Sequence, residues 1–275
     1  MRHSIATARR MLGCAVFAAA ATVTAGAASA QSDDLAKYHE MLSDPFANPG
    51  WFAVDRGEVL WSTPAGPKNA TLEDCDLGLG PGVVDGAYAQ MPRYFADADR
   101  VMDADTRIAW CREALQGIPF AQSAKTAFSK KNEYSEMQDL TAYVAAQSEG
   151  MPLAPPMAHP REIEAAAIGE ALFYRRGSML DYSCATCHGH TGARIRLQEL
   201  SNLTEADEAG AVMVTWPTFR VSHETVRTMQ HRMWDCQWQM RMPDIAFGSE
   251  ASVALISYLT RTGAGAEMAS PGLKR

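Results

Sequence analysis

The stretch Cys184-Ala185-Thr186-Cys187-His188 decides how the rest of the chain is interpreted. Cys-x-x-Cys-His is the pattern to which c-type haem is attached: both thiols bond to the haem, and the histidine binds its iron. A redox dithiol gains nothing from the adjacent His188, and a zinc site needs further ligands that are not grouped here. The pattern therefore predicts one covalent haem c, with Cys184 and Cys187 as its attachment points and His188 as an iron ligand.

The sequence on either side of this motif is that of a helical protein. Residues 161–176 carry apolar side chains at helical spacing, and Pro160 stands at the start of the segment. Ser249 occupies the N-cap position of a last helix, whose apolar residues continue to position 259. A helix, a haem motif, a long irregular middle and a final helix follow one another as in a c-type cytochrome. Strand signals are sparse, so the predicted fold class is mainly α.

A proline-rich run at residues 151–156 divides the chain, and the same pattern appears on both sides of it. The Gly-Glu-Val-Leu-Trp of residues 57–61 resembles the Gly-Glu-Ala-Leu-Phe of residues 169–173. An Arg-x-x-x-Cys pattern follows at 107–111 and again at 232–236, and each half closes on an apolar helical pattern. Matches in the same order predict a tandem duplication. We therefore expect two tandem cytochrome c-like domains, of which only the second binds haem.

The predicted organisation has three parts: a signal peptide over 1–30, a cytochrome c-like domain without haem over 31–150, and a haem-binding cytochrome c domain over 151–275. The first part begins with arginines, continues as an alanine-rich apolar stretch and ends in Ala28-Ser29-Ala30, an A-x-A cleavage site. This signal predicts a periplasmic protein. No later segment reaches eighteen uninterrupted apolar residues, so we expect no membrane anchor.

The charge of the chain narrows the range of partners. It holds 32 acidic and 25 basic residues, a formal net charge of −7. Loss of the signal peptide would remove three arginines and no acidic residue. An acidic surface argues against nucleic acid and anionic membranes as partners. An anionic substrate would therefore need a local positive patch.

Three cysteines downstream of the signal peptide remain outside the haem motif. Cys75 and Cys111 occupy matching positions in the first half, where the second thiol and the histidine of a haem motif are missing. In an oxidising compartment two such cysteines predict a disulfide, with two separate thiols as the alternative. Cys236 then has no partner, and it could be an iron ligand, a reactive thiol or both.

The residues alone leave the second iron ligand open. Met242 stands before the last helix, where many small cytochromes place a methionine ligand, and Met233 and Met240 lie near it. Cys236 is the competitor, and its thiolate would lower the reduction potential that a methionine would raise. Arg232 lies one helical turn before Cys236. Its guanidinium could lower the pKa of the thiol and bind an oxyanion, or it could pair with a haem propionate or be solvated.

The run Arg-Met-Trp-Asp-Cys-Gln-Trp-Gln-Met-Arg at residues 232–241 resembles the SoxA family, the catalytic c-type cytochrome subunits of the thiosulfate-oxidising SoxAX complex. The resemblance covers the mature chain, and its Arg-x-x-x-Cys-Gln-x-Gln-x-Arg pattern is quite specific. It implies an L-cysteine S-thiosulfotransferase. In this reaction thiosulfate is oxidatively joined to a cysteine of the carrier SoxYZ, and two electrons leave through haem to the partner cytochrome SoxX.

The resemblance also implies roles for individual residues. Cys236 would be both the distal iron ligand and the catalytic sulfur, and Arg232 would be the substrate-site arginine. The first haem motif of some relatives is absent at Cys75, so the chain resembles the single-haem branch, in which a disulfide replaces that haem. The alternative function is a periplasmic electron-transfer cytochrome c with His188 and Met242 as iron ligands and no substrate site.

We expect one covalent haem per chain, because only Cys184 and Cys187 precede a histidine at the required spacing. The intact mass of the mature, acid-denatured protein measures this directly. A mass that includes two haems, or none, would contradict the prediction.

Overall fold

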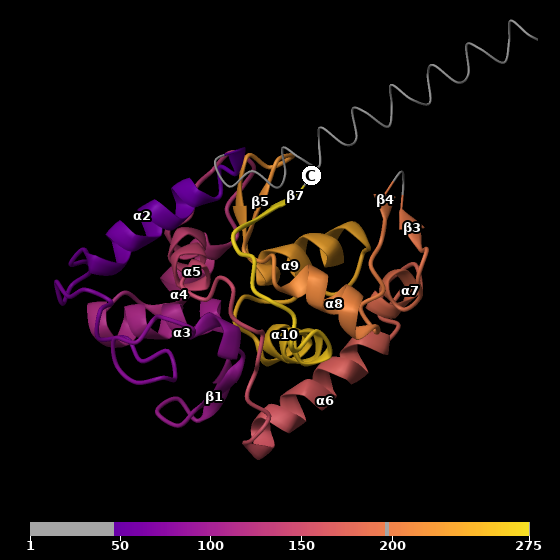
Figure 1. The fold of residues 1–275 in the computed structure, drawn as a ribbon, viewed down its shortest axis with the longest axis horizontal. Helices are drawn as coiled ribbons and strands as arrows, with labels where there is room; N and C mark the ends of the chain where they lie inside the picture. The colour runs from indigo at the N-terminus through magenta and orange to yellow at the C-terminus, as the bar shows by residue number, and fades with distance from the viewer. Residues whose placement is uncertain (1–46, 196–197, 275) are drawn as a thin grey trace, which may run out of the picture. The chain divides into compact units, whose positions relative to one another are not determined.

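The computed structural model describes residues 47–195 and 198–274, and its elements are mainly helices (Figure 1). The predicted signal peptide and the start of the predicted first domain lie outside these residues. From Pro49 onward the chain forms one compact unit. Within the described ranges, no helix is both long and apolar enough to cross a bilayer.

From residue 47 on, the described part of the first half contains four α-helices, a short 3-10 helix, a π-helical turn and a hairpin. In chain order they are α2 (Trp51–Ser62), η2 (Tyr88–Gln90), β1 (Arg93–Phe95), β2 (Arg100–Met102), α3 (Ala104–Cys111), η3 (Arg112–Gln116), α4 (Phe120–Ala127) and α5 (Glu136–Ala146). Strands β1 and β2 pair antiparallel, with Tyr94 opposite Val101.

The second half, described except for residues 196, 197 and 275, contains five helices and five short strands. They are α6 (Pro160–Tyr174), α7 (Cys184–His188), β3 (Arg194–Ile195), β4 (Gln198–Glu199), α8 (Ala206–Met213), β5 (Thr218–Arg220), β6 (Thr225–Arg227), α9 (Met229–Gln239), α10 (Glu250–Thr262) and β7 (Gly272–Lys274). Strand β5 is the middle of a three-stranded sheet, antiparallel to β6 and parallel to β7. The strands are two or three residues long, so the prediction of a mainly α fold is confirmed.

Each half contains a pair of helices that cross at a glycine. Gly57 of α2 lies so close to α5 that a Cβ atom there would overlap the carbonyl oxygen of Asp139. Gly169 of α6 lies in the same way on α10, against the carbonyl oxygen of Ala254. Only glycine permits this approach of two backbones. These are the two glycines with which the matching sequence segments begin, so the sequence repeat corresponds to a repeated helix crossing.

Apolar side chains form a core in each half. The core of the first half packs around Trp61, Leu77, Met102, Ile108 and Leu140. The core of the second half packs around Phe173, Trp216, Leu255, Leu259 and Met268. The division is not complete, because Phe247 joins the first core and Ala89 joins the second. The two halves therefore fold around separate centres that touch along one boundary.

In the structure Cys75 and Cys111 are bonded to each other, with 1.98 Å between the two sulfur atoms. Both are nearly fully buried in the core of the first half. Cys111 is the last residue of α3, so the bond ties this helix to a loop that precedes it by 36 residues. The disulfide lies in the half that lacks a haem motif. Cys75 stands there at the position that Cys184 of the haem motif has in the second half.

Replacing Cys75 and Cys111 together by alanine should lower the free energy of unfolding by about 4 kcal/mol, because the unfolded chain regains the freedom of the closed loop. Urea denaturation of the wild-type and double-mutant proteins measures the difference. Peptide mapping without reduction is the companion experiment, and recovery of both cysteines as free thiols would refute the pairing.

Candidate haem centre

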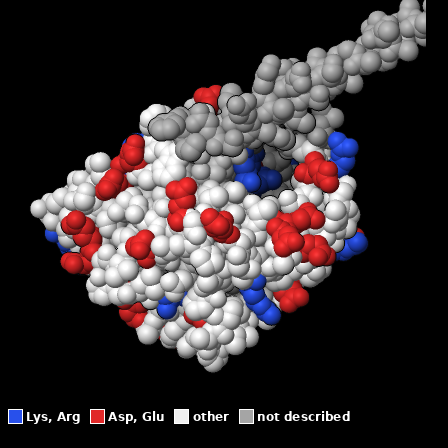
Figure 2. All heavy atoms as spheres, in the orientation of Figure 1, with Lys and Arg blue, Asp and Glu red and all other residues white. Residues whose placement is uncertain are grey.

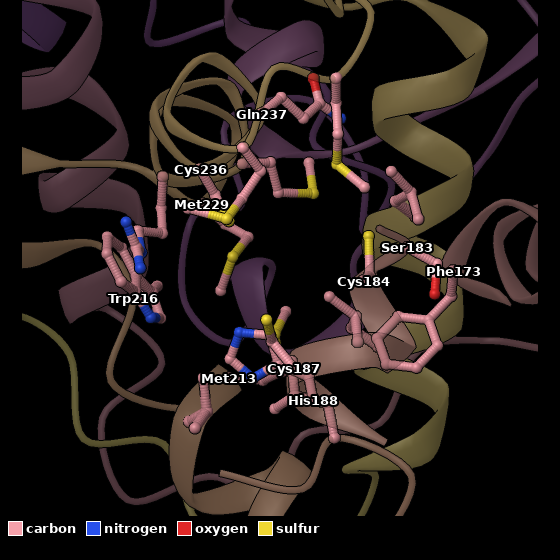
Figure 3. A pocket seen from close by; sticks show the side chains of 18 residues that line it. Phe173, Ser183, Cys184, Cys187, His188, Met213, Trp216, Met229, Cys236 and Gln237 are labelled. Atoms are coloured by element: carbon pink, nitrogen blue, oxygen red, sulfur yellow. The ribbon is translucent and has the colours of Figure 1, made fainter. Parts of the chain in front are cut away.

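A cavity enclosed by α6, α7, α8, α9 and α10 brings together the site residues that the sequence predicts (Figure 3). It contains about 860 Å³ of empty space, part of it open to solvent. Cys184, Cys187, His188, Arg232 and Cys236 all line it. The rest of its wall is mostly apolar, as a site for a large, flat, hydrophobic group requires.

Helix α7 holds the haem motif and has little more than one turn. Its first turn is fixed by a capping box: the hydroxyl of Ser183 accepts from the backbone N–H of Thr186 at 3.2 Å, and the hydroxyl of Thr186 accepts from the N–H of Ser183 at 2.9 Å. Figure 3 shows the sulfur atoms of Cys184 and Cys187 and the ring of His188 around the same empty space.

The ring of His188 is oriented by the backbone. Its Nδ1 lies 2.9 Å from the carbonyl oxygen of Ser201, which can only accept, so Nδ1–H donates. The lone pair is then on Nε2, the nitrogen left for a metal. Burial lowers the pKa of His188, which favours the neutral imidazole that binds iron. The contact to Ser201 was not predicted, because this carbonyl belongs to no motif.

Helix α9 brings Arg232 and Cys236 to the cavity. In Figure 3 Cys236 lies across the empty space from His188. Burial raises the pKa of the Cys236 thiol, and the charge of Arg232 opposes that shift. Arg232 therefore lowers the thiol pKa as expected, but loss of hydration is the larger effect and the net shift of the pKa is upward. Burial likewise raises the pKa of Cys184, to about 11.

Arg232 has a partner that the sequence analysis missed. Its Nη1 lies 3.0 Å from a carboxylate oxygen of Asp235, one turn further along α9. The two side chains are 30% and 16% exposed, so the pair stands at the edge of solvent and remains accessible. The spacing i, i+3 on a predicted helix was the signal that could have identified it.

Further basic residues surround this pair. Burial and the charge of Arg232 lower the pKa of Arg220, and burial and the charge of Arg220 lower the pKa of Lys274. Burial also lowers the pKa of Arg227, to about 10. Figure 2 shows acidic side chains scattered over one face of the molecule, and a group of basic side chains on one side of a hollow. The structure thus contains the local positive patch that an anionic substrate would need.

The cavity wall also contains the three methionines that are alternative iron ligands to Cys236: Met233, Met240 and Met242. The positions of the lining residues do not by themselves select one of these sulfur atoms. Trp216 forms a further part of the wall.

The polar atoms of the cavity wall also fit a haem. Among the described residues, the Nε1 of Trp216 and the Oε1 of Gln237 are buried in the cavity wall without a hydrogen-bond partner. A haem combines an apolar ring, an iron that needs an imidazole, and carboxylates that need donors. The apolar wall, the oriented His188 and the unpartnered N–H of Trp216 match these three requirements.

A helix with the haem motif, beside a cavity that α6 and α10 also line, indicates the class: the chain is a mainly helical c-type cytochrome. Residues 56–153 match the family described as "SoxA/TsdA, cytochrome c domain". The chain is 41% identical over 264 residues to the L-cysteine S-thiosulfotransferase subunit SoxA of Hydrogenophilus thermoluteolus, a match that covers 94% of this chain and 96% of that protein. The chain therefore belongs to the SoxA family, as its sequence motifs predicted.

Two further comparisons agree with this assignment. A SoxA subunit of the same name from Hydrogenobacter thermophilus is 32% identical over 228 residues, with 82% of each chain covered. The crystal structure of SoxXA from P. pantotrophus superimposes with a TM-score of 0.70 at 24% identity, covering 86% of this chain and 83% of that chain. The superposition shows that the fold is shared. The family match at 56–153 lies on the half that lacks the haem motif.

Proposed function

We propose that the chain is a single-haem L-cysteine S-thiosulfotransferase subunit that joins thiosulfate to a cysteine of a SoxYZ carrier and passes electrons through haem c to SoxX. The names of its relatives support this activity. The observation that carries the proposal is the juxtaposition of three groups in one cavity: His188 on one side, Cys236 across from it, and Arg232 one helical turn from Cys236.

The proposal includes the organisation of the chain. After a signal peptide over 1–30 that directs export to the periplasm, a haem-free cytochrome c-like domain occupies 31–150, and the haem domain occupies 151–275. The repeated helix crossing and the separate cores support two domains of one ancestry. The family match at 56–153 supports a cytochrome origin for the half without haem.

The reaction gives each residue a distinct role. The Cys236 thiolate and the outer sulfur of thiosulfate form an S–S bond as two electrons leave. The carrier thiolate then attacks that outer sulfur, which forms the S–S bond of the product and releases the Cys236 thiolate. The bound haem, held by Cys184, Cys187 and His188, supplies the electron acceptor. Arg232 binds the sulfonate end of thiosulfate through charge-assisted hydrogen bonds, and Asp235 keeps its guanidinium in place.

We propose Cys236 as both the distal iron ligand and the catalytic sulfur. Cys75 and Cys111 are bonded to each other, and Cys184 and Cys187 belong to the haem motif, so Cys236 is the one thiol left over in the mature chain. Metal coordination keeps a cysteine in the thiolate form, which is the reactive one. The alternative, an electron carrier that uses a methionine ligand, is favoured only by the position of Met242 in the same wall.

Replacing Cys236 by methionine should keep the haem, raise its reduction potential and abolish carrier conjugation, because a thioether is a weaker donor than a thiolate and has no nucleophilic form. Replacing Met242 by alanine should change neither the potential nor the ligand bands greatly. The visible and near-infrared spectra of the oxidised protein and a redox titration distinguish the two ligands. The opposite pattern, an active Cys236→Met protein and a spectrum shifted by Met242→Ala, would establish the electron carrier instead.

Replacing Arg232 by alanine should reduce turnover by about 30- to 1,000-fold and leave haem content intact, because a truncated oxyanion partner often costs about 2–4 kcal/mol. Lysine at this position should restore only part of the rate, since it lacks the bidentate fork. The assay combines the purified protein with SoxX, SoxYZ and thiosulfate. Arg261→Ala, on the exposed end of α10, is the matched control and should turn over normally. A near-normal rate for Arg232→Ala would assign that arginine a structural role.

A further inference from the structure

The chain segment that leads into α9 is attached to the first half. Arg227 is 2% exposed, and its guanidinium donates to the hydroxyl of Ser129, to the carbonyl oxygen of Lys130 at 2.9 Å and to the amide oxygen of Gln138 at 3.3 Å. All three acceptors belong to the first half, in or beside α4 and α5. The last strand residue before α9 is thus held across the boundary between the two halves.

Gln230, in the first turn of α9, makes the second attachment. Its side chain is completely buried. Its Nε2 lies 2.7 and 2.9 Å from the two carboxylate oxygens of Asp103 and 3.0 Å from the hydroxyl oxygen of Thr106. Asp103 is the N-cap of α3 and accepts from the backbone N–H of Thr106 at 3.0 Å. The amide therefore contacts a helix start that the first half already fixes.

The oxygen of the same amide holds the other neighbour of α9. The Oε1 of Gln230 accepts from the backbone N–H of Gly248 at 2.8 Å and from the hydroxyl of Ser252 at 3.3 Å. These residues lie at the start of α10, the helix that crosses Gly169 beside the haem motif. One buried amide thus joins α3, α9 and the start of α10.

Further along α9 the contact with the first half is apolar: Trp234 stacks on Phe128 with 5.5 Å between the ring centroids. Among the described residues, the side chains of residues 232–239 make one hydrogen bond, and it is internal to the helix: Arg232 donates to Asp235. Cys236 lies six residues beyond Gln230, about 9 Å along a helix of 1.5 Å rise per residue. A small change in the direction of the first turn therefore displaces Cys236 and Arg232 together. In the view of Figure 1, α9 lies between the helices of the first half and α8.

We propose that Gln230 is a positioning residue, whose amide fixes α9 against the first half and so sets the positions of Cys236 and Arg232 over the haem cavity. This inference rests on the proposed function of those two residues. The haem-free half then acts as a support for catalysis. Its helix α3, tied by the disulfide at Cys111 and capped by Asp103, is the base on which the catalytic helix is aligned.

The charge around Gln230 shows why an amide is required there. Asp103 faces its N–H group, with Asp105 and Tyr88 in the same buried region, and Arg100 donates to the carbonyl oxygen of Gly248 at 2.6 Å. Burial raises the pKa of both carboxyls, to about 7 for Asp105, whose neighbour Asp103 adds to the shift. A carboxylate in place of the amide would face Asp103 without a donor. Once protonated, it would present one O–H to Asp103 and one acceptor to Gly248.

Two substitutions in the haem-loaded protein test the proposal. Gln230→Leu should lower kcat by about 10- to 100-fold, with a smaller change in KM for thiosulfate, because displaced catalytic groups slow the reaction more than they weaken binding. It should also shift the ligand bands and the reduction potential at every pH. Gln230→Glu should show the same shifts at pH 8 and lose them as the pH falls, because the repulsion from Asp103 raises the pKa of the new carboxyl and protonation restores the donor.

Ser148→Ala is the matched control, because it removes a comparable buried hydrogen bond, to the backbone N–H of Ala89, far from α9 in the sequence. It should lower the melting temperature and leave kcat, bands and potential unchanged. Wild-type bands, potential and kcat in Gln230→Leu would overturn the proposal. Should that protein not fold, a Gln230→Glu spectrum that stays constant with pH overturns it equally. A Cys236→Met protein with an unchanged spectrum would instead refute the proposed function. In that case the reduction potential of Gln230→Leu, compared with that of the wild type, decides whether Gln230 positions α9.

Discussion

The backbone contact between α6 and α10 at Gly169 is the constraint on which the haem cavity depends. With no side chain between them, the two helices approach closely enough for Phe173 of α6 and Leu255 and Leu259 of α10 to form one continuous apolar wall. Helix α6 then leads into the short loop that presents α7 and its thiols. A Cβ atom at Gly169 would push the helices apart, and the wall, the loop and the haem motif would move with them.

The same helix crossing occurs at Gly57, yet the two halves use it differently. Arg107 and Arg232 both stand four residues before a cysteine, but Arg107 is 3% exposed, bonds both oxygens of Asp97 and donates to the carbonyl of Asp76. Its cysteine is bonded to Cys75. The arginine of the first half is therefore fully used by the structure, whereas Arg232 keeps one carboxylate partner and an accessible edge. The same Arg-x-x-x-Cys pattern is thus part of the folded interior in the first half and lies at an accessible cavity in the second.

The features that could be predicted from the sequence are those encoded by residues close together in the chain. The haem motif spans five residues, and its residue types alone indicate covalent haem attachment. The helical fold class follows from the periodic spacing of apolar residues, and the family follows from the run at residues 232–241. The contact of His188 with the carbonyl of Ser201 and the bridge from Gln230 to Asp103 could not be predicted. The second joins residues 127 positions apart, and a glutamine within a polar helix turn carries no sign of its partner. Such contacts are fixed by packing, which no local pattern records.

The distribution of charge adds a last step to this picture. The chain is acidic, yet Arg227 is buried against neutral acceptors, and burial lowers the pKa of Arg220 and Lys274 nearby. A buried cation without a carboxylate is destabilising unless hydrogen bonds compensate for lost hydration. The stability of the fold does not explain why these basic side chains cluster near Asp235. An anion such as thiosulfate gives one, because it needs positive charge that the acidic surface elsewhere does not offer.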